Sequence, residues 1–271
     1  MIARTRRAFG FIALAALVAL VPSWALAQLA SFGPSGVVMG HIHVVGRDLD
    51  AHRRFWTALG ATPTKNGTLE MMQFPGAFVN LRQGEPTGGS VGSVIDHVGF
   101  NVKSMAEWLP KWQAEGLKME PQTRPTQVYL IGPDDVRVEI LEDANIDSSI
   151  KFHHVHYFVA DPIAAQKYYA ETFGAIPGKR GMFDAADLPG VNLTFSKATG
   201  PVVKTQGRSI DHVGFEVRNL ETFLKGLVAK GTKLDREYQK SGGANLYLSY
   251  ITDPFGTYLE LTEGLAPGSL R

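Results

Sequence analysis

The sequence predicts an α+β protein built from four copies of one unit, each a strand, a helix and then about three more strands. The hexapeptide Ile-Asp-His-Val-Gly-Phe occurs at 95–100 and again at 210–215. Histidines at 41, 97, 154 and 212 each stand seven residues before a side chain that favours a helix N-cap, namely Asp48, Ser104, Asp161 and Asn219. Glycines that favour helix ends follow at 60, 116, 174 and 231, in steps of 56, 58 and 57 residues.

Each helix has its own local signals. The first is expected over Leu49–Leu59, and the second opens with a capping box formed by Ser104 and Glu107. The third has Pro162 at its first helical position, and the fourth places leucines and Phe223 at helical spacing. Apolar or alternating runs after the helices predict strands, among them Ala77–Arg82, Val128–Ile131, Val136–Leu141, Val191–Ser196, Leu246–Tyr250 and Thr257–Leu261.

One unit is too small to bury its own sheet face, so the units are expected to pair. The polar stretch 142–149 is interpreted as the divider between two pairs. The expected domains are therefore 38–143, with units 38–90 and 94–143, and 150–264, with units 150–200 and 208–264. Tails at 28–37 and 265–271 flank them. The sequence leaves open whether units pair within one chain or across a homodimer.

The first 27 residues have the features of an export signal. A basic start with Arg4, Arg6 and Arg7 precedes an apolar run from Phe9 to Val21, and Ala25-Leu26-Ala27 resembles a cleavage site. We therefore expect residues 1–27 to be a signal peptide and the mature protein to be periplasmic or secreted, without a membrane span. The paired arginines also fit a twin-arginine signal, and both export routes stay open.

Composition excludes some classes of partner. Loss of the signal would leave 24 basic and 26 acidic residues, a net charge of −2, because all three arginines removed carry positive charge. No basic patch indicates nucleic acid or an anionic membrane. The chain has no cysteine, so an exported form must be stabilised by its core, a ligand or an oligomer.

The βαβββ repeat, the histidine on each first strand and the run Asp-Pro-Phe-Gly-Thr-Tyr-Leu-Glu-Leu at 253–261 together resemble the vicinal oxygen chelate superfamily. This superfamily holds glyoxalases, bleomycin-resistance proteins and extradiol dioxygenases. The resemblance covers about 38–264. It implies that paired units curl into two half-open, cup-like barrels with an active site inside each.

The resemblance also implies metal ligands on the first and last strands of the units. Carried over by position, they are His41, His97 and Glu139 in the front pair and His154, His212 and Glu260 in the rear pair. Two imidazoles and a carboxylate suit a divalent ion with open coordination positions, which could be iron, manganese, zinc, nickel or cobalt. A metal-free core of buried histidines is the alternative for each cup.

Two departures from family patterns bear on the reaction. The place of a second glutamate, which serves glyoxalases as base, reads Asn80 in the first unit and Asn192 in the third, and asparagine cannot take a proton near neutral pH. Tyr250 fits the extradiol signature and Tyr129 echoes it, so both are candidates to contact substrate in catalysis. The upstream histidine of that signature is absent.

The other histidines are weaker candidates. Because strand side chains alternate, His43 shares a face with His41, and His156 with His154. We expect His43, His156, Asn80 and Asn192 to support the ligands or contact substrate, with lining of the cup as the alternative; His153 is weighed in the same way. His52 is expected to be solvated on a polar helix face.

These features predict an exported, metal-dependent enzyme acting on a small molecule with adjacent oxygen atoms. The missing base argues against isomerisation and the missing histidine argues against catechol cleavage. Oxygen insertion, elimination and isomerisation all stay open, and a dioxygenase or lyase type is the leading expectation. The alternative is a protein of the bleomycin-resistance type that sequesters a small molecule without catalysis. A third reading has one active cup and one that serves as scaffold.

Overall fold

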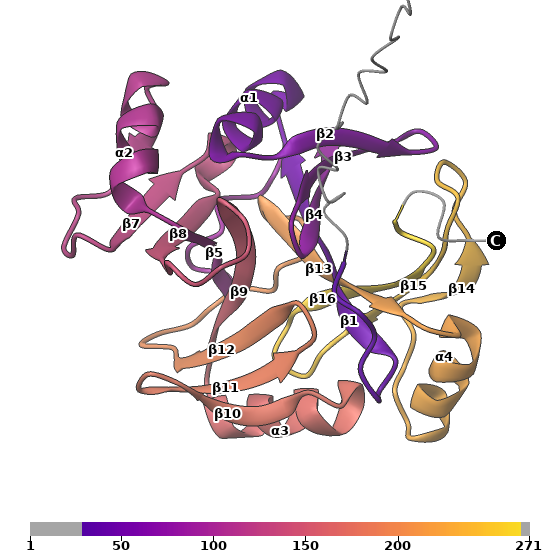
Figure 1. Cartoon of the computed structure of the whole chain (residues 1–271). Helices are drawn as coiled ribbons and strands as arrows, with labels where there is room; N and C mark the ends of the chain where they lie inside the picture. Colours follow the sequence, from indigo (N-terminus) through magenta and orange to yellow (C-terminus); the bar gives the residue numbers. More distant parts are fainter. Residues whose placement is uncertain (1–28, 267–271) are drawn as a thin grey trace, which may run out of the picture.

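The computed structural model describes residues 29–266, and four units of one strand, one helix and three strands follow each other along them (Figure 1). The first unit consists of β1 (Val37–Gly46), α1 (Leu49–Leu59), β2 (Thr62–Asn66), β3 (Leu69–Phe74) and β4 (Ala77–Gln83). The second consists of β5 (Ile95–Val102), α2 (Met105–Ala114), β6 (Lys118–Met119), β7 (Gln127–Ile131), the short 3-10 turn η1 (Pro133–Asp135) and β8 (Arg137–Glu142).

The second half repeats this order. The third unit consists of β9 (Ile150–Val159), α3 (Pro162–Phe173), β10 (Ile176–Arg180), β11 (Phe183–Leu188) and β12 (Val191–Lys197). The fourth consists of β13 (Ile210–Val217), α4 (Leu220–Ala229), β14 (Arg236–Lys240), β15 (Tyr247–Thr252) and β16 (Tyr258–Glu263). The predicted α+β fold of four βαβββ units is therefore confirmed.

The helix caps form largely as the sequence predicts. Asp48, Ser104 and Asp161 each accept a hydrogen bond from the backbone N–H three residues on. Asn219 does not cap with its side chain; it takes a left-handed conformation with φ of 55°. At the other end, Gly60 and Gly174 stop α1 and α3 in the left-handed region, as expected for C-terminal glycine.

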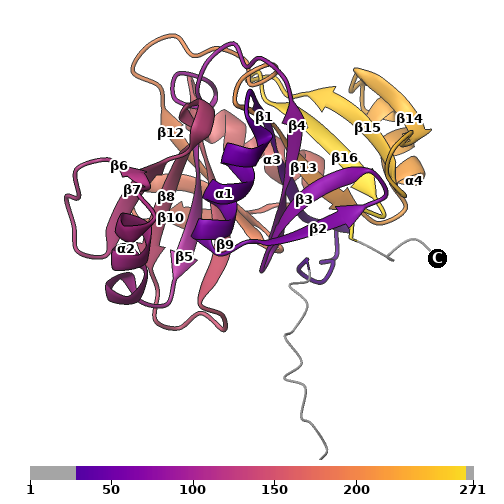
Figure 2. The same ribbon diagram turned by 90° about the horizontal axis from the view of Figure 1, so that it is seen from above.

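The units pair differently from the prediction. One sheet has the strand order β14-β15-β16-β13-β1-β4-β3-β2, so the first unit shares it with the fourth. The other has the order β10-β11-β12-β9-β5-β8-β7-β6, so the second unit shares it with the third. We call these curved sheets cup A and cup B (Figure 2). The expectation that units adjacent in sequence share a sheet in the pairs first–second and third–fourth is wrong, whereas the domain boundaries derived from it stay a prediction.

The connections explain this pairing. The stretch 142–149 was interpreted as a divider, but its residues 143–149 link β8 to β9 inside cup B. This link is short enough to bring β9 antiparallel onto β5. The segments 84–94 and 198–209 are the ones that run between the cups. They also bond to each other: the N–H of Val94 donates to the carbonyl of Val203, and that of Thr87 to Gly207. Polar composition alone did not distinguish a divider from a tight connection.

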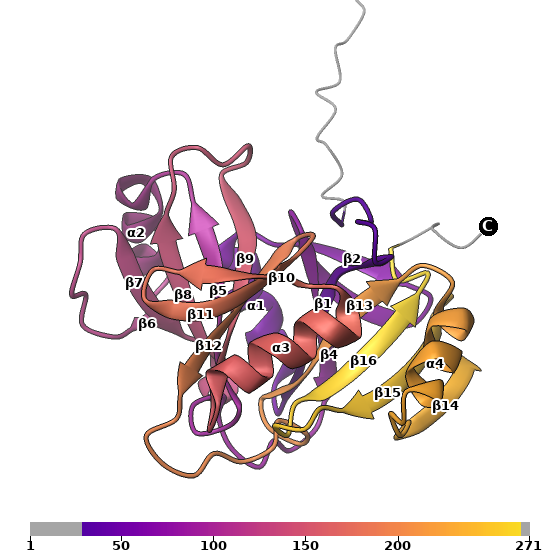
Figure 3. The same cartoon turned by 90° about the horizontal axis from the view of Figure 1, so that it is seen from below.

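The two sheets bend into half-open cups, as the contacts between their distant strands show. In cup A, Asn66 at the end of β2 donates hydrogen bonds to the carbonyls of Gly264 and Leu265, which follow β16. In cup B, Arg180 at the end of β10 reaches Glu139 on β8, several strands away in the sheet order. Figure 3, which views the molecule from below, shows α3 in front of the strands. Tyr169 on α3 donates a hydrogen bond of 2.8 Å to Asp253, which lies in the β15–β16 turn of the other cup.

Other expectations from the sequence concern the two ends of the chain and its helices. The expected signal peptide at 1–27 lies outside the described residues, as does most of the expected tail 265–271. Within 29–266, none of the helices is long and apolar enough to cross a membrane. His52 was expected to be solvated, but it is fully buried near the end of β1, where its Nε2 donates to Asp134 at 3.1 Å. The turn η1, which contains Asp134, packs over His52. The spacing of residues within α1 could not have revealed this contact.

Candidate metal centre

The repeated hexapeptide places the same three side-chain roles in each cup. Asp96 and Asp211 accept hydrogen bonds from the Nδ1 atoms of the next residues, His97 and His212, at 2.7 and 2.6 Å. This contact fixes each ring so that Nε2 faces into the cup, an arrangement common beside metal-binding histidines. The apolar residues of the hexapeptide are buried in the core.

The glycine of the hexapeptide makes room for a histidine from the neighbouring unit. A Cβ atom on Gly214 would lie 2.0 Å from the His41 ring, and one on Gly99 would lie 1.8 Å from the His154 ring. Because β1 pairs with β13 and β5 with β9, each glycine lies directly opposite that histidine in the ladder. The hexapeptide therefore supplies an oriented imidazole and the space for a second one.

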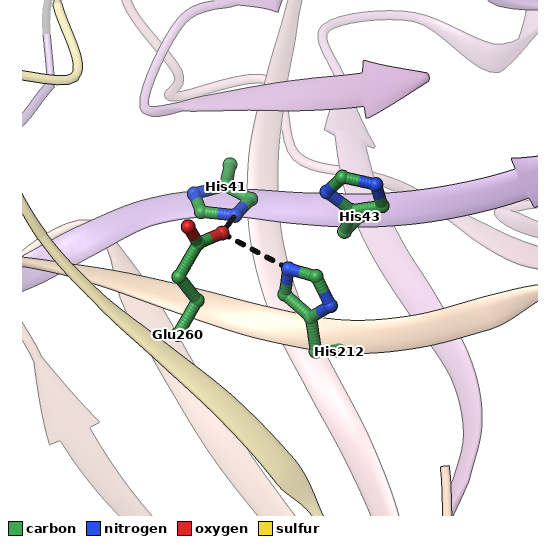
Figure 4. A group of neighbouring side chains, drawn as sticks. All are labelled: His41, His43, His212 and Glu260. Carbon is green, nitrogen blue, oxygen red and sulfur yellow. Dashed lines mark hydrogen bonds and ion pairs between the residues drawn. The ribbon is translucent and has the colours of Figure 1, made fainter. Parts of the chain in front are cut away.

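Site A consists of His41 and His43 on β1, His212 on β13 and Glu260 on β16, whose ligand atoms all lie within 4.8 Å of one another (Figure 4). His41 Nε2 donates to Glu260 Oε2 at 2.8 Å, and His212 Nε2 donates to the same oxygen at 3.0 Å. Metal–ligand distances of about 2.0–2.2 Å require donor atoms within about 4.4 Å of each other. Two imidazole nitrogens and one carboxylate oxygen therefore already converge as a metal ion needs.

Burial and hydrogen bonding set the charges in site A. Burial raises the pKa of Glu260, but the hydrogen bonds from His212 and His41 outweigh it and hold that pKa well below its ordinary value. Burial lowers the pKa of His41, and it lowers that of His43 to well below the usual value with a further contribution from His212. For His212 burial also acts downward, but the carboxylates of Asp211 and Glu260 reverse it and raise the pKa.

The donor set of site A fits a divalent metal. Around site A, four buried side-chain atoms have no hydrogen-bond partner among the residues that the structure describes: both ring nitrogens of His43, Nδ1 of His41 and Oδ1 of Asn80. Buried polar atoms without partners carry a desolvation cost, which a bound ion or ligand would remove. The rings of His43 and His212 stack at 4.3 Å between centroids, so His43 lies beside the ligand set.

A cavity opens onto site A. It has a volume of about 270 Å³ and is lined by His41, His43, Asn80, Tyr250 and Glu260 together with apolar side chains including Leu69, Leu246, Leu248 and Leu265. Tyr250 lies directly opposite Glu260 in the ladder. Burial, followed by the Glu260 charge, raises the Tyr250 pKa, so its hydroxyl stays protonated at neutral pH. The cavity thus presents a hydrogen-bond donor and a neutral imidazole next to the converging ligand atoms.

Site B consists of His97 on β5, His154 and His156 on β9 and Glu139 on β8. Glu139 Oε2 lies 2.9 Å from His154 Nε2 and 3.4 Å from His97 Nε2. Within residues 29–266 neither of these nitrogens has a hydrogen-bond partner of good geometry. The three imidazoles lie within 4.8 Å of one another as a metal-ligand group in their own right, without Glu139.

Other side chains bind the carboxylate of site B. Arg180 Nη2 donates to Glu139 Oε2 at 3.1 Å, and Tyr129 donates to Oε1 at 2.8 Å. Gln127 also donates to Oε1. Both oxygens of Glu139 are therefore engaged by groups other than histidine. A second cavity of about 490 Å³, lined by aromatic side chains and by Arg137 and Lys197, lies beside His97, Tyr129 and His156.

The two candidate asparagines are not equivalent. Asn80 lies beside His43 in the β1–β4 ladder, but Asn192 lies beside His154, and Thr194 is the residue beside His156. The strand register is thus offset by two residues from the match expected by sequence. Asn192 donates to Asp187 at 2.7 Å and accepts from Thr194, so it is tied to its own hairpin. His153 contacts His154, with 2.9 Å between their Nδ1 atoms.

The structure brings together all six predicted ligands, but in other sets. The prediction grouped His97 with His41 and His212 with His154; the structure groups His41, His212 and Glu260 in cup A and His97, His154 and Glu139 in cup B. The exchange follows directly from the pairing of the first unit with the fourth. Sequence reasoning missed Asp96, Asp211, Gln127 and Arg180, although the aspartates stand next to the histidines inside the repeated hexapeptide.

Comparison with known proteins supports the fold. Residues 151–261 match the Glyoxalase/Bleomycin resistance protein/Dioxygenase superfamily, which confirms the resemblance seen in the sequence. This segment contains the third and fourth units, so it contributes strands to both cups. No curated protein matches the chain by sequence.

Two solved structures extend the likeness to the other units. Glyoxalase I from Zea mays aligns with a TM-score of 0.68 and 16% identity, over 84% of this chain and 92% of that one. A proposed dioxygenase from Bacillus subtilis aligns with a TM-score of 0.68 and 14% identity, over 85% of this chain and 86% of that one. At these identities the likeness establishes the fold, with its four units and two cups.

Proposed function

We propose, on the premise that residues 151–261 belong to the glyoxalase/bleomycin resistance protein/dioxygenase superfamily, that this chain is a metal-dependent enzyme whose reaction takes place in cup A. The observation that carries the proposal is the convergence of His41 Nε2 and His212 Nε2 on one oxygen of Glu260. A divalent ion bound by these three groups keeps open positions and acts as a Lewis acid on oxygen atoms of a substrate.

The side chains around these ligands indicate which chemical groups a substrate of cup A would carry. Burial lowers the pKa of His43, so its ring is neutral, and with no partner for its ring nitrogens among residues 29–266 it can accept a hydrogen bond from a substrate hydroxyl. Protonated Tyr250 donates a hydrogen bond to a second substrate oxygen. A small molecule with two adjacent oxygens, one of them a hydroxyl, matches both groups and fits a cavity of about 270 Å³.

The reaction is proposed to be of dioxygenase or lyase type. Asn80 stands where a glyoxalase-type isomerase needs a carboxylate base, and an amide cannot accept a proton near neutral pH. Leu69, Leu246, Leu248 and Leu265 give the cavity an apolar lining. Sequestration without catalysis would need the same cavity but no metal, so metal content distinguishes the two functions.

Metal analysis of matched variants tests this proposal. Glu260→Gln keeps the shape of the side chain but removes its charge, and we expect metal bound per chain to fall from about one to near zero, since a genuine site fills stoichiometrically. Glu139→Gln is the matched control in cup B and should leave cup A loaded. Purified protein that takes up no cobalt, zinc, manganese, nickel or iron on titration would contradict the proposal and favour sequestration.

Export is a separate proposal. The basic and apolar pattern of residues 1–27 supports removal of a signal peptide and a periplasmic or secreted mature protein. The intact mass of protein recovered from the periplasm of an expression host should correspond to a chain that begins at Gln28. Protein that keeps Met1 or stays in the cytoplasm would contradict it. Pairing of two chains as a homodimer also stays a prediction, and sedimentation of the mature protein tests it.

A further inference from the structure

The β2–β3 hairpin of cup A and the β10–β11 hairpin of cup B occupy corresponding places in their units, and their turns differ by one charge. Residues 65–70 read Lys-Asn-Gly-Thr-Leu-Glu, and residues 179–184 read Lys-Arg-Gly-Met-Phe-Asp. The ladders agree, because Lys65 pairs with Glu70 and Lys179 with Asp184. Arg180 in cup B therefore occupies the place of Asn66 in cup A.

The two residues act on different parts of their cups. The Asn66 side chain donates to two backbone carbonyls at 2.9 Å and accepts from the backbone N–H of Asn245, so it closes the cup without touching Glu260. The Arg180 guanidinium instead lies against the carboxylate that belongs to the ligand set, at 3.1 Å, with its side chain only 19% exposed.

A second pair of corresponding residues also differs between the cups. Tyr129 lies opposite Glu139, and Tyr250 opposite Glu260, so the residues two positions before these tyrosines correspond. That position is Gln127 in cup B, which donates to Glu139, and Leu248 in cup A, which lines the cavity. Arg180 and Gln127 thus place donors on both oxygens of Glu139.

We propose that cup B does not bind a metal ion and that the Arg180 guanidinium takes the place of the cation beside Glu139. A guanidinium on a buried carboxylate supplies the positive charge that the site requires and forms charge-assisted hydrogen bonds. A divalent ion entering there would meet a fixed positive charge and a carboxylate without a free oxygen. The three imidazoles of site B would have to bind it next to that charge, and His156 Nε2 is already bonded to Ser196 at 2.8 Å.

The assignment of the cation in cup B is independent of the reaction proposed for cup A, because it rests only on the neighbours of Glu139. The cavity of about 490 Å³ in cup B is lined by His97, Tyr129 and His156, by further aromatic side chains, and by the charged residues Arg137, Asp184 and Lys197, and it does not include Arg180 or Glu139.

Exchange of the two residues between the cups tests the inference. Arg180→Asn with Gln127→Leu gives cup B the residues of cup A, and titration with Co²⁺ followed by visible absorption and calorimetry should rise from one ion per chain to two. Arg180→Lys with Gln127→Leu keeps the positive charge and should stay at one. Circular dichroism and thermal unfolding establish that each variant is folded.

Either of two results would overturn the inference. One is a wild-type chain that binds two ions and loses one of them with Glu139→Gln. The other is a folded Arg180→Asn, Gln127→Leu chain that gains none. If cup A itself binds no ion, the wild type should bind none and the exchanged variant one, which Glu139→Gln then abolishes; that pattern would refute the proposed function and still support this inference.

Discussion

Cups A and B are built from the same unit, yet their carboxylates have different neighbours. Glu260 Oε2 in cup A accepts hydrogen bonds from His41 and His212, whereas Glu139 in cup B also accepts hydrogen bonds from Arg180 and Gln127, whose counterparts in cup A are Asn66 and Leu248. The strands, the hexapeptide and the aspartates are shared. On the proposal made above, Arg180 and Gln127 decide whether the same backbone binds a metal ion or carries a guanidinium in its place.

Removal of the space opposite the ligand histidine should have the largest effect. Gly214→Ala places a Cβ atom 2.0 Å from the His41 ring, so the ring must move or the strands must separate. We expect a loss of about 1–3 kcal/mol in the free energy of unfolding, typical of overpacking, together with loss of the bound metal. Gly99→Ala should destabilise cup B by a similar amount and leave metal content unchanged. Equal metal loss in both variants would contradict the comparison.

The aspartates of the hexapeptide should show the same asymmetry in a milder form. Asp211→Asn weakens the hydrogen bond that orients His212, and we expect metal affinity to fall by about 10–100-fold. Asp96→Asn makes the same change next to His97 and should leave the affinity as it was. Competition with a chromophoric chelator measures both. A larger effect from Asp96→Asn would place the metal in cup B.

The hairpin can also be changed in the direction opposite to the exchange in cup B. Asn66→Arg brings a guanidinium to the end of β2 in cup A, and we expect at least a roughly tenfold weaker metal affinity from its charge. Asn66→Ala removes the same hydrogen bonds to Gly264 and Leu265 without adding charge, so it separates the two causes. Equal metal affinities for the two variants would show that a positive charge at position 66 does not weaken metal binding at Glu260.

The hydrogen bond between Tyr169 and Asp253, which joins the two cups, should give the smallest effect. Its contribution to the free energy of unfolding should depend on pH. Burial raises the pKa of Asp253 despite hydrogen bonds from Thr257 and Tyr169. A carboxyl whose folded pKa is raised favours folding while protonated, and that stability is lost as pH rises from the unfolded value of about 3.9 through the folded pKa. Each pKa unit that separates the folded from the unfolded carboxyl corresponds to about 1.4 kcal/mol of stability lost.

Asp253→Asn removes this titration. Its unfolding free energy relative to wild type should therefore increase as pH rises across that window and then level off. Chemical denaturation at a series of pH values measures the difference. A difference that is constant with pH would mean that Asp253 titrates normally in the folded protein.

Local signals in the sequence predicted the elements well, and the side chains predicted as ligands do gather in the two cups. The spacing from His97 to Ser104 and on to Gly116 defined one unit, and its repetition defined the rest. Pairing between units was not predictable in the same way, because it depends on which connection is short enough to fold back within a sheet. The predicted grouping of His41 with His97 followed from the expected pairing of the first unit with the second, and it was wrong for the same reason.

The charge next to Glu139 illustrates a different limit. Arg180 is the last residue of an edge strand, and its contact with β8 exists only because the sheet curls. Nothing in the residues around Arg180 indicates a carboxylate partner 41 positions away. The aligned hairpins at 65–70 and 179–184 contain the one signal that could have found it, since asparagine and arginine differ in charge at corresponding positions.

Anomalous diffraction from crystals of the Co²⁺- or Zn²⁺-loaded protein tests the central claim most directly, because it locates the ion as well as counting it. We expect one peak per chain, about 2.0–2.2 Å from His41 Nε2, His212 Nε2 and an oxygen of Glu260. Arg180 should remain on Glu139 with no peak beside it. A peak beside Glu139 with Arg180 displaced, or cup A without any peak, would contradict the account.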